Sequence, residues 1–445
     1  MFGYSGLALR MLRRFSVRVG DRIVVEDRGR KYEGVLMPRA ELGMPNHLVL
    51  KLKNGYNIGV RISGTTKISL VERGKPPSLE KPQLPARRAQ DRSVTILGTG
   101  GTIASRVDYR TGAVYPAFTP EEIYGAVPEL AEVADIRVIE VCNVFSEHMT
   151  PDLWVSIGRT AAREIRRGAS GVVIAHGTDT MGYTAAALSF MLRGLYRPVV
   201  LVGAQRSSDR PSSDAALNLL SAVSVAANSD IAEVTAVMHG SMSDDHCLIH
   251  RGTKVRKCHT SRRDAFLTVN DLPLGIVRGT RIEMLRSDYN RASATGRMTI
   301  KGKFERKVAL LKATPGISSD LMLGMIRMGY RGFVIEGTGL GHVPEGLFKG
   351  VKKAVDAGIP VVMTSQCIWG RVDMKVYSTG RDLLALGVIP GEDMLPETAW
   401  VKLMWALGQT RNVEKIRQIM GTNIAGEMTS RTLPETYDSQ RLKWS

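Results

Sequence analysis

The sequence predicts a small β-rich domain followed by a larger α/β region with mainly parallel sheets. Two observations support this fold class. Short β-branched runs separated by turn residues fill the N-terminal part of the chain. From Ser93 onward, short apolar runs alternate with longer amphipathic stretches, as in strands joined by crossover helices. The predicted boundaries are a basic β domain at 1–72, a linker at 73–92, and two lobes at 93–286 and 287–445.

Length and composition limit the class of protein. The chain has 445 residues, too many for one ordinary domain, and 43% of them are hydrophobic, which is normal for a globular protein. No apolar run reaches the ~18 residues that a membrane span needs. The cysteines are scattered without a C-x-x-C pair, which favours reduced thiols in a cytoplasmic protein over a disulfide framework or a zinc site.

Positive charge is concentrated near the N-terminus. The formal net charge is +18, and residues 1–92 hold most of the excess of Lys and Arg over Asp and Glu. Such a module suits a polyanionic or acidic partner. A solvated basic surface explains the same composition equally well, because net charge governs association and not fold.

The N-terminal domain contains closely spaced strand signals. His47–Lys53 has a leucine at every second position, which is the period of a half-buried strand, and Asn54-Gly55 is a strong hairpin turn. Several short strands in so little chain predict a small SH3-like β-barrel with a docking role and no catalytic cluster. The strands are predicted at Arg22–Glu26, Lys31–Met37, His47–Lys53, Tyr56–Ile62 and Thr66–Val71.

The linker and the α/β region follow. Residues 73–92 are rich in proline and have no hydrophobic period, which predicts an extended, semi-rigid segment. The polar stretch Ser287–Lys303 is predicted to join the two lobes. Strands are predicted at Val94–Leu97, Ile136–Val141, Val172–Ala175, Val199–Val202, Val234–Met238, Val308–Leu311, Phe333–Ile335 and Val361–Met363. Helices are predicted at Pro120–Val127, Pro151–Arg167, Thr184–Arg193, Ser213–Asn228, Ser318–Met328, Gly346–Ala357 and Glu397–Leu407.

Unusual polar residues stand at the ends of several predicted strands. The carboxyl ends of parallel strands meet at one edge of a sheet, where open α/β folds bind ligands. The sequence therefore predicts a site at this edge, although glycine and threonine also serve in plain turns. The segments concerned are Gly98–Thr102, His176–Thr180, Gly203–Arg206 and Glu336–Gly339.

The chemistry of such a site depends on threonine. A threonine hydroxyl is a poor nucleophile until a base removes its proton, and a desolvated lysine is a candidate base. Thr99 and Thr102 both lie in the first loop, Lys257 lies in a polar stretch, and Asp179 is able to orient such a lysine. Spacing alone does not distinguish Lys257 from the other lysines of the chain.

Three other kinds of site fit the sequence less well. The loop after Val94–Leu97 lacks the G-x-G-x-x-G form, and Glu140 comes too late for a dinucleotide fingerprint. No P-loop motif occurs. His239, His246 and His250 are clustered but lack the spacing of a zinc site. We therefore expect no metal in this chain.

Five motifs resemble those of the bacterial-type L-asparaginase family, and the resemblance covers most of the chain beyond the linker. It implies an L-asparaginase-like two-lobed α/β fold with parallel sheets, and amidase chemistry. The motifs are TGGTIAS at Thr99–Ser105, HGTDT at His176–Thr180, VGAQR at Val202–Arg206, SSDAALNL at Ser212–Leu219, and the stretch from Lys257 to Phe266.

The resemblance also implies catalytic roles. Thr102 matches the family's acyl nucleophile, which leaves Thr99 as a loop residue. Thr178, Asp179 and Lys257 match a second catalytic group of threonine, aspartate and lysine.

Further positions match residues that bind substrate. Ser146 and Glu147 match the family's substrate-binding pair, and Asp179 matches the carboxylate that also holds the substrate α-amino group. The family has a flexible lid with a tyrosine near the nucleophile. Tyr109 and Tyr115 both lie in the corresponding region here, and the resemblance does not choose between them.

The basic domain and the linker have no counterpart in a plain asparaginase. They resemble the N-terminal part of the family of archaeal glutamyl-tRNA(Gln) amidotransferase D subunits. That resemblance implies a glutaminase that takes ammonia from glutamine or asparagine, without a cofactor of its own. It also implies a partner E subunit that uses ATP and Mg²⁺ to convert Glu-tRNA(Gln) to Gln-tRNA(Gln), in a D2E2 heterotetramer with a homodimeric core.

Two alternatives to this function remain open from the sequence. The chain can be a stand-alone L-asparaginase or glutaminase with an additional barrel, or a non-catalytic scaffold that has kept the fold. The intact set of two threonines, an aspartate and a lysine argues against the scaffold.

Overall fold

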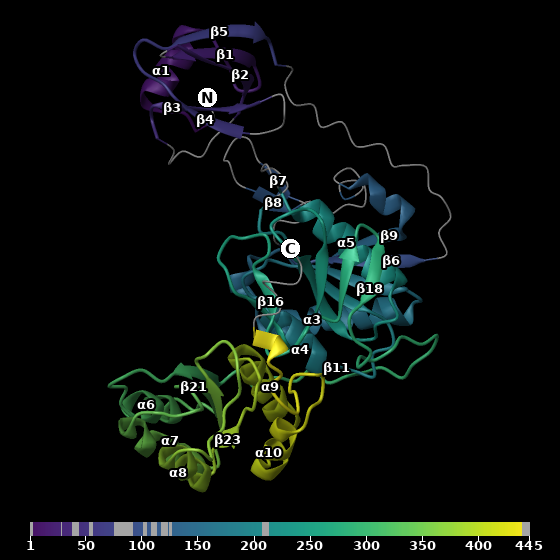
Figure 1. Ribbon diagram of the computed structural model, residues 1–445, viewed down its shortest axis with the longest axis vertical. Coiled ribbons are helices and arrows are strands. Elements are labelled where there is room, and N and C mark those ends of the chain that lie inside the picture. Colours follow the sequence, from purple (N-terminus) through teal and green to yellow (C-terminus); the bar gives the residue numbers. More distant parts are fainter. Residues whose placement is uncertain are drawn as a thin grey trace. The chain divides into compact units, whose positions relative to one another are not determined.

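The computed structural model describes residues 3–27, 29–37, 44–52, 57–74, 92–100, 105–107, 114–116, 123, 127–206 and 213–437. The chain divides into two compact units, one built mainly on the N-terminal residues and the other on most of the chain from Glu129 onward (Figure 1). No helix in the described part of the chain is both long and apolar enough to cross a membrane.

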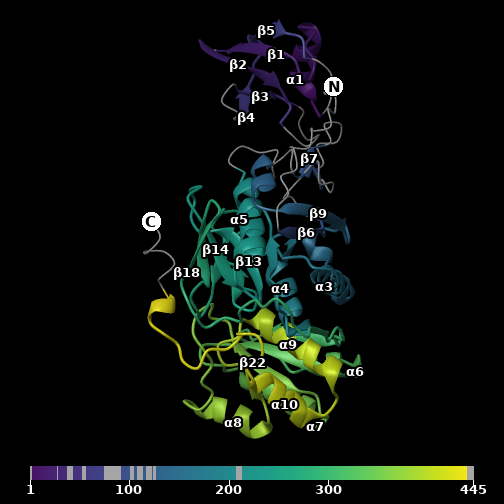
Figure 2. The same ribbon diagram turned by 90° about the vertical axis from the view of Figure 1, so that its right-hand side faces the viewer.

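The N-terminal unit contains the predicted barrel-like domain, a five-stranded antiparallel sheet in the order β4-β3-β2-β1-β5 (Figure 2). Alternating side chains such as Ile23, Val25, Leu48 and Leu50 are fully buried and form its core. The strands are β1 (Arg22–Asp27), β2 (Arg30–Leu36), β3 (His47–Lys51), β4 (Asn57–Arg61) and β5 (Lys67–Glu72). Two further short strands, β7 (Ser105–Val107) and β8 (Val114–Pro116), form an antiparallel pair.

A helix that the sequence analysis did not predict completes the barrel core. Helix α1 (Gly6–Arg14) buries Ala8, Met11 and Leu12 among the barrel residues, at the i, i+3, i+4 spacing of one helix face. The Tyr4 hydroxyl donates to the Met37 carbonyl oxygen at 2.7 Å and ties the start of this segment to the sheet.

The second unit begins with an eight-stranded sheet in the order β18-β17-β14-β13-β12-β10-β6-β9. The five strands from β13 to β9 are parallel, as predicted, whereas β14, β17 and β18 extend the sheet in antiparallel fashion. Helices α3 and α4 pack against this sheet (Figure 1). The strands are β6 (Ser93–Gly98), β9 (Asp135–Glu140), β10 (Gly171–Ala175), β12 (Val199–Val202), β13 (Val234–His239), β14 (Cys247–Arg251), β17 (Gly275–Arg278) and β18 (Arg281–Met284).

Several smaller elements accompany this sheet. The hairpin of β15 (Val255–Lys257) and β16 (Phe266–Thr268) lies outside it. Strand β11 (Leu192–Arg193) pairs with β19 (Thr299–Ile300), which lies in the otherwise irregular segment that joins the lobes. The helices are α3 (Pro151–Arg166), α4 (Met181–Met191) and α5 (Ala215–Asn228), with 3-10 turns η1 (Pro128–Glu132) and η2 (Ser146–His148). Of the predicted helix at Pro120–Val127, only Ile123 and Val127 are among the described residues.

The C-terminal lobe is a four-stranded parallel sheet in the order β20-β21-β22-β23 with helices on both faces. Val334 packs with α9 and α10, while Phe333 and Ile335 pack with α6, α7 and α8. Such continuous apolar strands are typical of parallel sheets covered on both sides. The elements are β20 (Val308–Lys312), β21 (Gly332–Gly337), β22 (Val361–Ser365), β23 (Ile389–Pro390), η3 (Glu345–Leu347), α6 (Asp320–Arg327), α7 (Phe348–Asp356), α8 (Ser378–Leu386), α9 (Pro396–Gln409) and α10 (Val413–Gly421).

The two lobes share apolar packing between α4 and α9. Phe190 of α4 stacks on Trp405 of α9 with ring centroids 6.0 Å apart. Helix α4 also starts earlier than predicted, at Met181, so that the HGTDT motif stands directly before its first turn. The packing therefore fixes a helix whose N-terminus lies at the predicted site. The boundaries predicted after residues 72, 92 and 286 remain predictions.

Candidate active site

The first loop of the predicted site begins where β6 ends beside β10. Thr99 is 1% exposed, and its hydroxyl donates to the Ala175 carbonyl oxygen at 2.8 Å. Gly100 has a φ of +103°, and a Cβ there would lie 2.1 Å from the Val144 carbonyl oxygen, so only glycine fits. Thr99 thus holds the loop to the neighbouring strand. The predicted nucleophile, Thr102, lies outside the described residues.

The structure does not describe the side chains of the two candidate lid tyrosines. Tyr109 lies outside the described residues, and Tyr115 belongs to β8, of which only the backbone is described.

The predicted triad residues come together in the structure. Lys257 ends β15, while Thr178 and Asp179 stand between β10 and α4. The Lys257 Nζ donates to the Thr178 hydroxyl oxygen at 2.9 Å and to Asp179 Oδ1 at 2.7 Å. The lysine side chain is only 14% exposed, whereas the Asp179 side chain is 67% exposed. A hydroxyl, an amine and an orienting carboxylate in contact form a hydrogen-bonded set of the kind that moves protons during acyl transfer.

Lys254, the other lysine of this segment, has a different environment. Its Nζ lies 2.7 Å from Asp393 Oδ2, and both side chains are fully buried. Burial lowers the pKa of Lys254, and the carboxylate of Asp393 acts in the opposite direction. Lys254 therefore links the two lobes and does not reach the triad.

Ser146 is held beside the HGTDT motif. It is 4% exposed, and Thr180 donates its hydroxyl hydrogen to the Ser146 carbonyl oxygen at 2.6 Å. A Cβ on Gly177 would lie 2.8 Å from the Ser146 Cβ, so the glycine of the motif is needed for this close approach. Glu147, the other predicted binding residue, is exposed in the same turn.

The buried ring of His176 contacts the HGTDT motif in its neutral form. Its Nδ1 lies 2.6 Å from the Gly177 carbonyl oxygen and its Nε2 lies 2.9 Å from the Thr184 hydroxyl, to which Trp154 also donates. Burial lowers the pKa of His176 to about 4, while the hydrogen bond to Gly177 acts to raise it. The ring is therefore uncharged at neutral pH.

This neutral ring predicts a loss of stability in acid. Between pH 6.5 and about 4, an unfolded chain protonates His176 and the folded protein does not, so stability falls as the pH falls, by up to about 3 kcal/mol. In urea unfolding at a series of pH values, His176→Gln is expected to show a shallower decline than the wild type. His148→Gln, at an exposed ring, serves as the control with an unchanged decline. Equal slopes for His176→Gln and wild type would contradict this account.

The sequence analysis considered His239 only as a metal ligand and did not place it at this sheet edge. His239, the last residue of β13, has its Nδ1 2.6 Å from Asn218 Oδ1 and its Nε2 3.1 Å from Asp244 Oδ1. Arg263 donates to the same Asp244 oxygen at 2.6 Å. The signal was available, because His239 ends a parallel strand at the edge that carries the other motifs. Within the described ranges, no three His, Cys, Asp or Glu side chains are placed to hold a metal ion.

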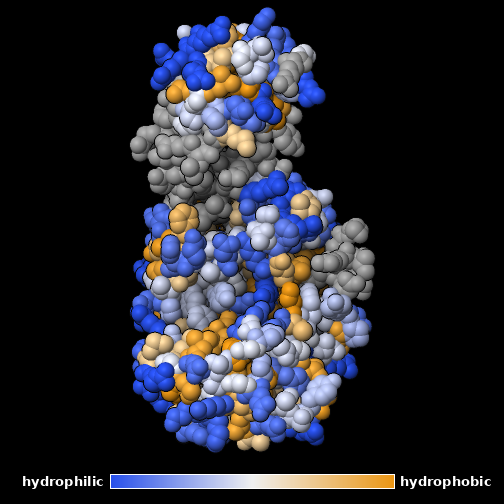
Figure 3. Space-filling view, turned by 90° about the vertical axis from the view of Figure 1, so that its left-hand side faces the viewer, coloured by the Kyte–Doolittle hydropathy of each residue, from blue (hydrophilic) through white to orange (hydrophobic). Residues whose placement is uncertain are grey.

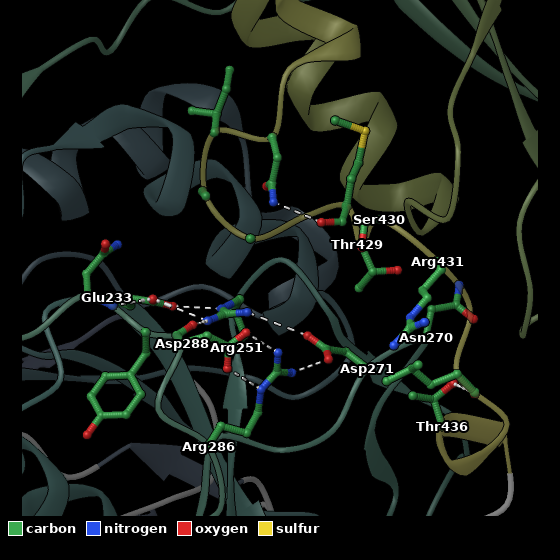
Figure 4. A pocket seen from close by; sticks show the side chains of 18 residues that line it. Glu233, Arg251, Asn270, Asp271, Arg286, Asp288, Thr429, Ser430, Arg431 and Thr436 are labelled. Atoms are coloured by element: carbon green, nitrogen blue, oxygen red, sulfur yellow. Dashed lines mark hydrogen bonds and ion pairs between the residues drawn. The ribbon is translucent and has the colours of Figure 1, made fainter.

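A polar hollow of the second unit is lined by none of these residues (Figure 4). It has a volume of about 610 Å³ and lies between the first lobe and the C-terminal segment. Arg251 bonds Glu233 at 2.8 Å and lies 3.5 Å from Asp271, while Arg286 bonds Asp271 and Asp288. These ion pairs join residues 233–288 to one another.

Three family models match the chain. Residues 17–71 match the GatD N-terminal domain, residues 93–290 match the N-terminal asparaginase domain, and residues 307–420 match the glutaminase/asparaginase C-terminal domain. These matches cover the barrel-like domain and both lobes.

Curated relatives and solved structures agree with the models. The D subunit of the glutamyl-tRNA(Gln) amidotransferase of Pyrococcus horikoshii is 54% identical over 96% of this chain and 98% of its own length. That of Methanothermobacter thermautotrophicus is 52% identical over the same shares.

Among solved structures, the thermostable L-asparaginase from Thermococcus kodakarensis has a TM-score of 0.69 and 35% identity over 76% of this chain and 99% of its own. L-asparaginase I from Vibrio cholerae has a TM-score of 0.66 and 31% identity over 76% of this chain and 99% of its own. The chain belongs to the family of glutamyl-tRNA(Gln) amidotransferase D subunits and combines their N-terminal domain with two asparaginase-type domains.

Proposed function

We propose that this chain is the glutaminase subunit of a tRNA-dependent amidotransferase. It releases ammonia from glutamine or asparagine, and a partner subunit uses the ammonia to convert Glu-tRNA(Gln) to Gln-tRNA(Gln). The observation that carries the proposal is the contact of Lys257 Nζ with both the Thr178 hydroxyl and the Asp179 carboxylate. A family member that had lost its chemistry would have no need for this arrangement.

The proposed reaction is an acyl transfer in two steps. The Thr102 hydroxyl oxygen attacks the side-chain amide carbon, its proton passes to the leaving nitrogen, and ammonia departs as an ester forms. Water then hydrolyses the ester and regenerates the threonine. Backbone N–H groups of the glycine loops serve as oxyanion donors, a contribution typically worth ~3–4 kcal/mol for each donor.

The remaining site residues have distinct proposed roles. Thr178 and Lys257 assist proton transfer, and Asp179 orients the lysine and also holds the positive α-amino group of the substrate. Its 67% exposed side chain leaves a carboxylate oxygen accessible for that purpose. Ser146 and Glu147 bind the substrate from the neighbouring turn. Either Tyr109 or Tyr115 closes the lid, and no metal or cofactor is needed in this chain.

We propose that the partner is an amidotransferase E subunit that binds ATP and Mg²⁺, in a cytoplasmic D2E2 heterotetramer with a homodimeric core of this chain. The barrel-like domain would dock the partner. Hydrophilic side chains cover much of the barrel face presented in Figure 3.

The exposed face of α1 supports an association with tRNA. It carries Arg10, Arg13 and Arg14 at the i, i+3, i+4 spacing, opposite the buried face of the same helix. Guanidinium groups on one face suit a phosphate backbone, because their binding releases the counterions of the nucleic acid.

The test is ammonia release by the full-length chain co-expressed with its E subunit. We expect the two to co-purify and glutamine hydrolysis to rise at least about tenfold when Glu-tRNA(Gln) and ATP are added, which is ~1.4 kcal/mol of activation. Uncharged tRNA is the matched control. Strong hydrolysis by the chain alone, with no response to partner or tRNA, would instead identify a stand-alone asparaginase or glutaminase.

A further inference from the structure

The proposed catalytic lysine lies in a short two-stranded hairpin. Lys257 pairs with Phe266 in the hairpin of β15 and β16, which has three residues in each strand. The turn between them is closed by a hydrogen bond from the Cys258 N–H to the Ala265 carbonyl oxygen at 2.7 Å. A two-stranded hairpin of this length is not stable alone, so other contacts must fix the position of the lysine.

An arginine in the turn provides such a contact. Arg263 is six positions after Lys257 in the sequence, and its side chain is only 11% exposed. Its Nη1 donates to Asp244 Oδ1 at 2.6 Å, and its Nη2 donates to the Met242 carbonyl oxygen. Both partners belong to the segment that leaves β13. The guanidinium therefore fastens the turn to the carboxyl edge of the large sheet.

The adjacent arginine makes only local contacts. Arg262 bonds both oxygens of Asp264 at 2.7 Å, within the same turn, and its side chain is 49% exposed. It contributes nothing to the link between the turn and the sheet. Arg262 is thus a matched control for Arg263.

The anchoring carboxylate is itself fixed by buried groups. His239 Nε2 lies 3.1 Å from Asp244 Oδ1, and the histidine ring is fully buried. His239 Nδ1 lies 2.6 Å from Asn218 Oδ1, while Asn218 donates through Nδ2 to the Gly203 carbonyl oxygen at 2.9 Å. These distances place Asp244 next to a chain of polar groups that begins at the ends of β12 and β13.

We propose that Arg263 and Asp244 are positioning residues that set the location of the Lys257 amine. The inference rests on the proposed catalytic role of Lys257. Their ion pair holds the turn against the sheet edge that also carries Thr178 and Asp179, so the amine stays within hydrogen-bonding distance of both. A displacement of about 1 Å at such a site is enough to lower a rate by ~10²-fold.

The first test compares turn variants of the full-length chain. We expect Arg263→Ala and Asp244→Ala to lower kcat for amide hydrolysis by about 10- to 100-fold, with KM changed less than about threefold. Asp244→Asn keeps an oxygen that accepts from Arg263 and is expected to retain most of the activity. Arg262→Ala is expected to keep wild-type kcat.

The second test separates positioning from general stability. In a Lys257→Ala background, adding Arg263→Ala is expected to cause no further loss of residual rate, because both changes act through one amine. A wild-type kcat for Arg263→Ala, with Lys257→Ala inactive, would overturn this inference. So would equal losses in the Arg262 and Arg263 variants, or a further loss in the double variant. Full activity of Lys257→Ala would instead overturn the proposed function of the lysine.

Discussion

Lys257→Ala is expected to lower kcat for glutamine or asparagine hydrolysis by at least about 10³-fold while leaving the fold intact. A positioned proton-transfer group contributes typically ~10²–10⁴-fold to a rate. Here the amine contacts both the Thr178 hydroxyl at 2.9 Å and Asp179 at 2.7 Å. Removing it takes away the amine that links the Thr178 hydroxyl to the Asp179 carboxylate. Steady-state ammonia release and a thermal melt of the same sample measure the two effects.

The fold is expected to survive this change because the carboxylate of the lost ion pair is largely exposed. The Asp179 side chain is 67% exposed, so water solvates its carboxylate once the lysine is gone, and such pairs contribute about 0–1 kcal/mol. Thr178→Val and Asp179→Asn are expected to abolish hydrolysis as well. Lys352→Ala, on the surface of α7, is the control with unchanged rate. Full activity of Lys257→Ala would refute the triad.

The parallel strands were predictable from the sequence because each is a short apolar run with a clear boundary. All five residues of β10 are buried, and the turn residues of the HGTDT motif follow at once. The antiparallel strand β14, which extends this sheet, was not predicted, because its apolar pattern is interrupted. Strand β14 is also fully buried, but it contains His250 and Arg251. These polar residues interrupt the run of apolar residues by which a buried strand is recognised.

Helix α1 was missed because its signal is short. It has nine residues, and Arg10 interrupts the apolar run that contains its buried side chains. Helical periodicity is clear only over longer windows. The helix is stabilised by tertiary packing, which buries Ala8, Met11 and Leu12 in the barrel core. The sequence of the short segment alone does not reveal this stabilisation.

The choice of Lys257 came from the resemblance to the L-asparaginase family, because spacing alone did not make it. Strand ends indicated where the site would be, but Lys257 and Thr178 are far apart in the sequence, and no spacing rule joins them. Lys254 lies in the turn before β15 and Lys257 is the last residue of that strand, so the local sequence does not indicate which partners their side chains have. The Lys254 side chain pairs with Asp393 of the second lobe, whereas the Lys257 side chain pairs with Asp179.

The buried pair of Lys254 and Asp393 predicts the largest change in stability. Lys254→Ala is expected to lower the free energy of unfolding by about 3–5 kcal/mol, because it takes the nearer cation away from a buried carboxylate. Among the described residues, Asp393 would keep the hydrogen bonds from Thr429, at 3.0 Å from the backbone N–H and 2.6 Å from the hydroxyl, and the ion pair with Arg371 at 3.6 Å. Urea unfolding of the full-length chain measures the change.

Two variants show whether the loss comes from an uncompensated charge. Lys254→Met combined with Asp393→Asn removes both charges, while the asparagine oxygen still accepts from Thr429. This double variant is expected to recover most of the lost stability, because a buried ion pair is often replaceable by neutral groups of similar volume. Lys352→Ala, at an exposed pair on α7, is expected to cost less than about 1 kcal/mol. If Lys254→Ala were no more destabilising than Lys352→Ala, the link between the lobes would not depend on this charge.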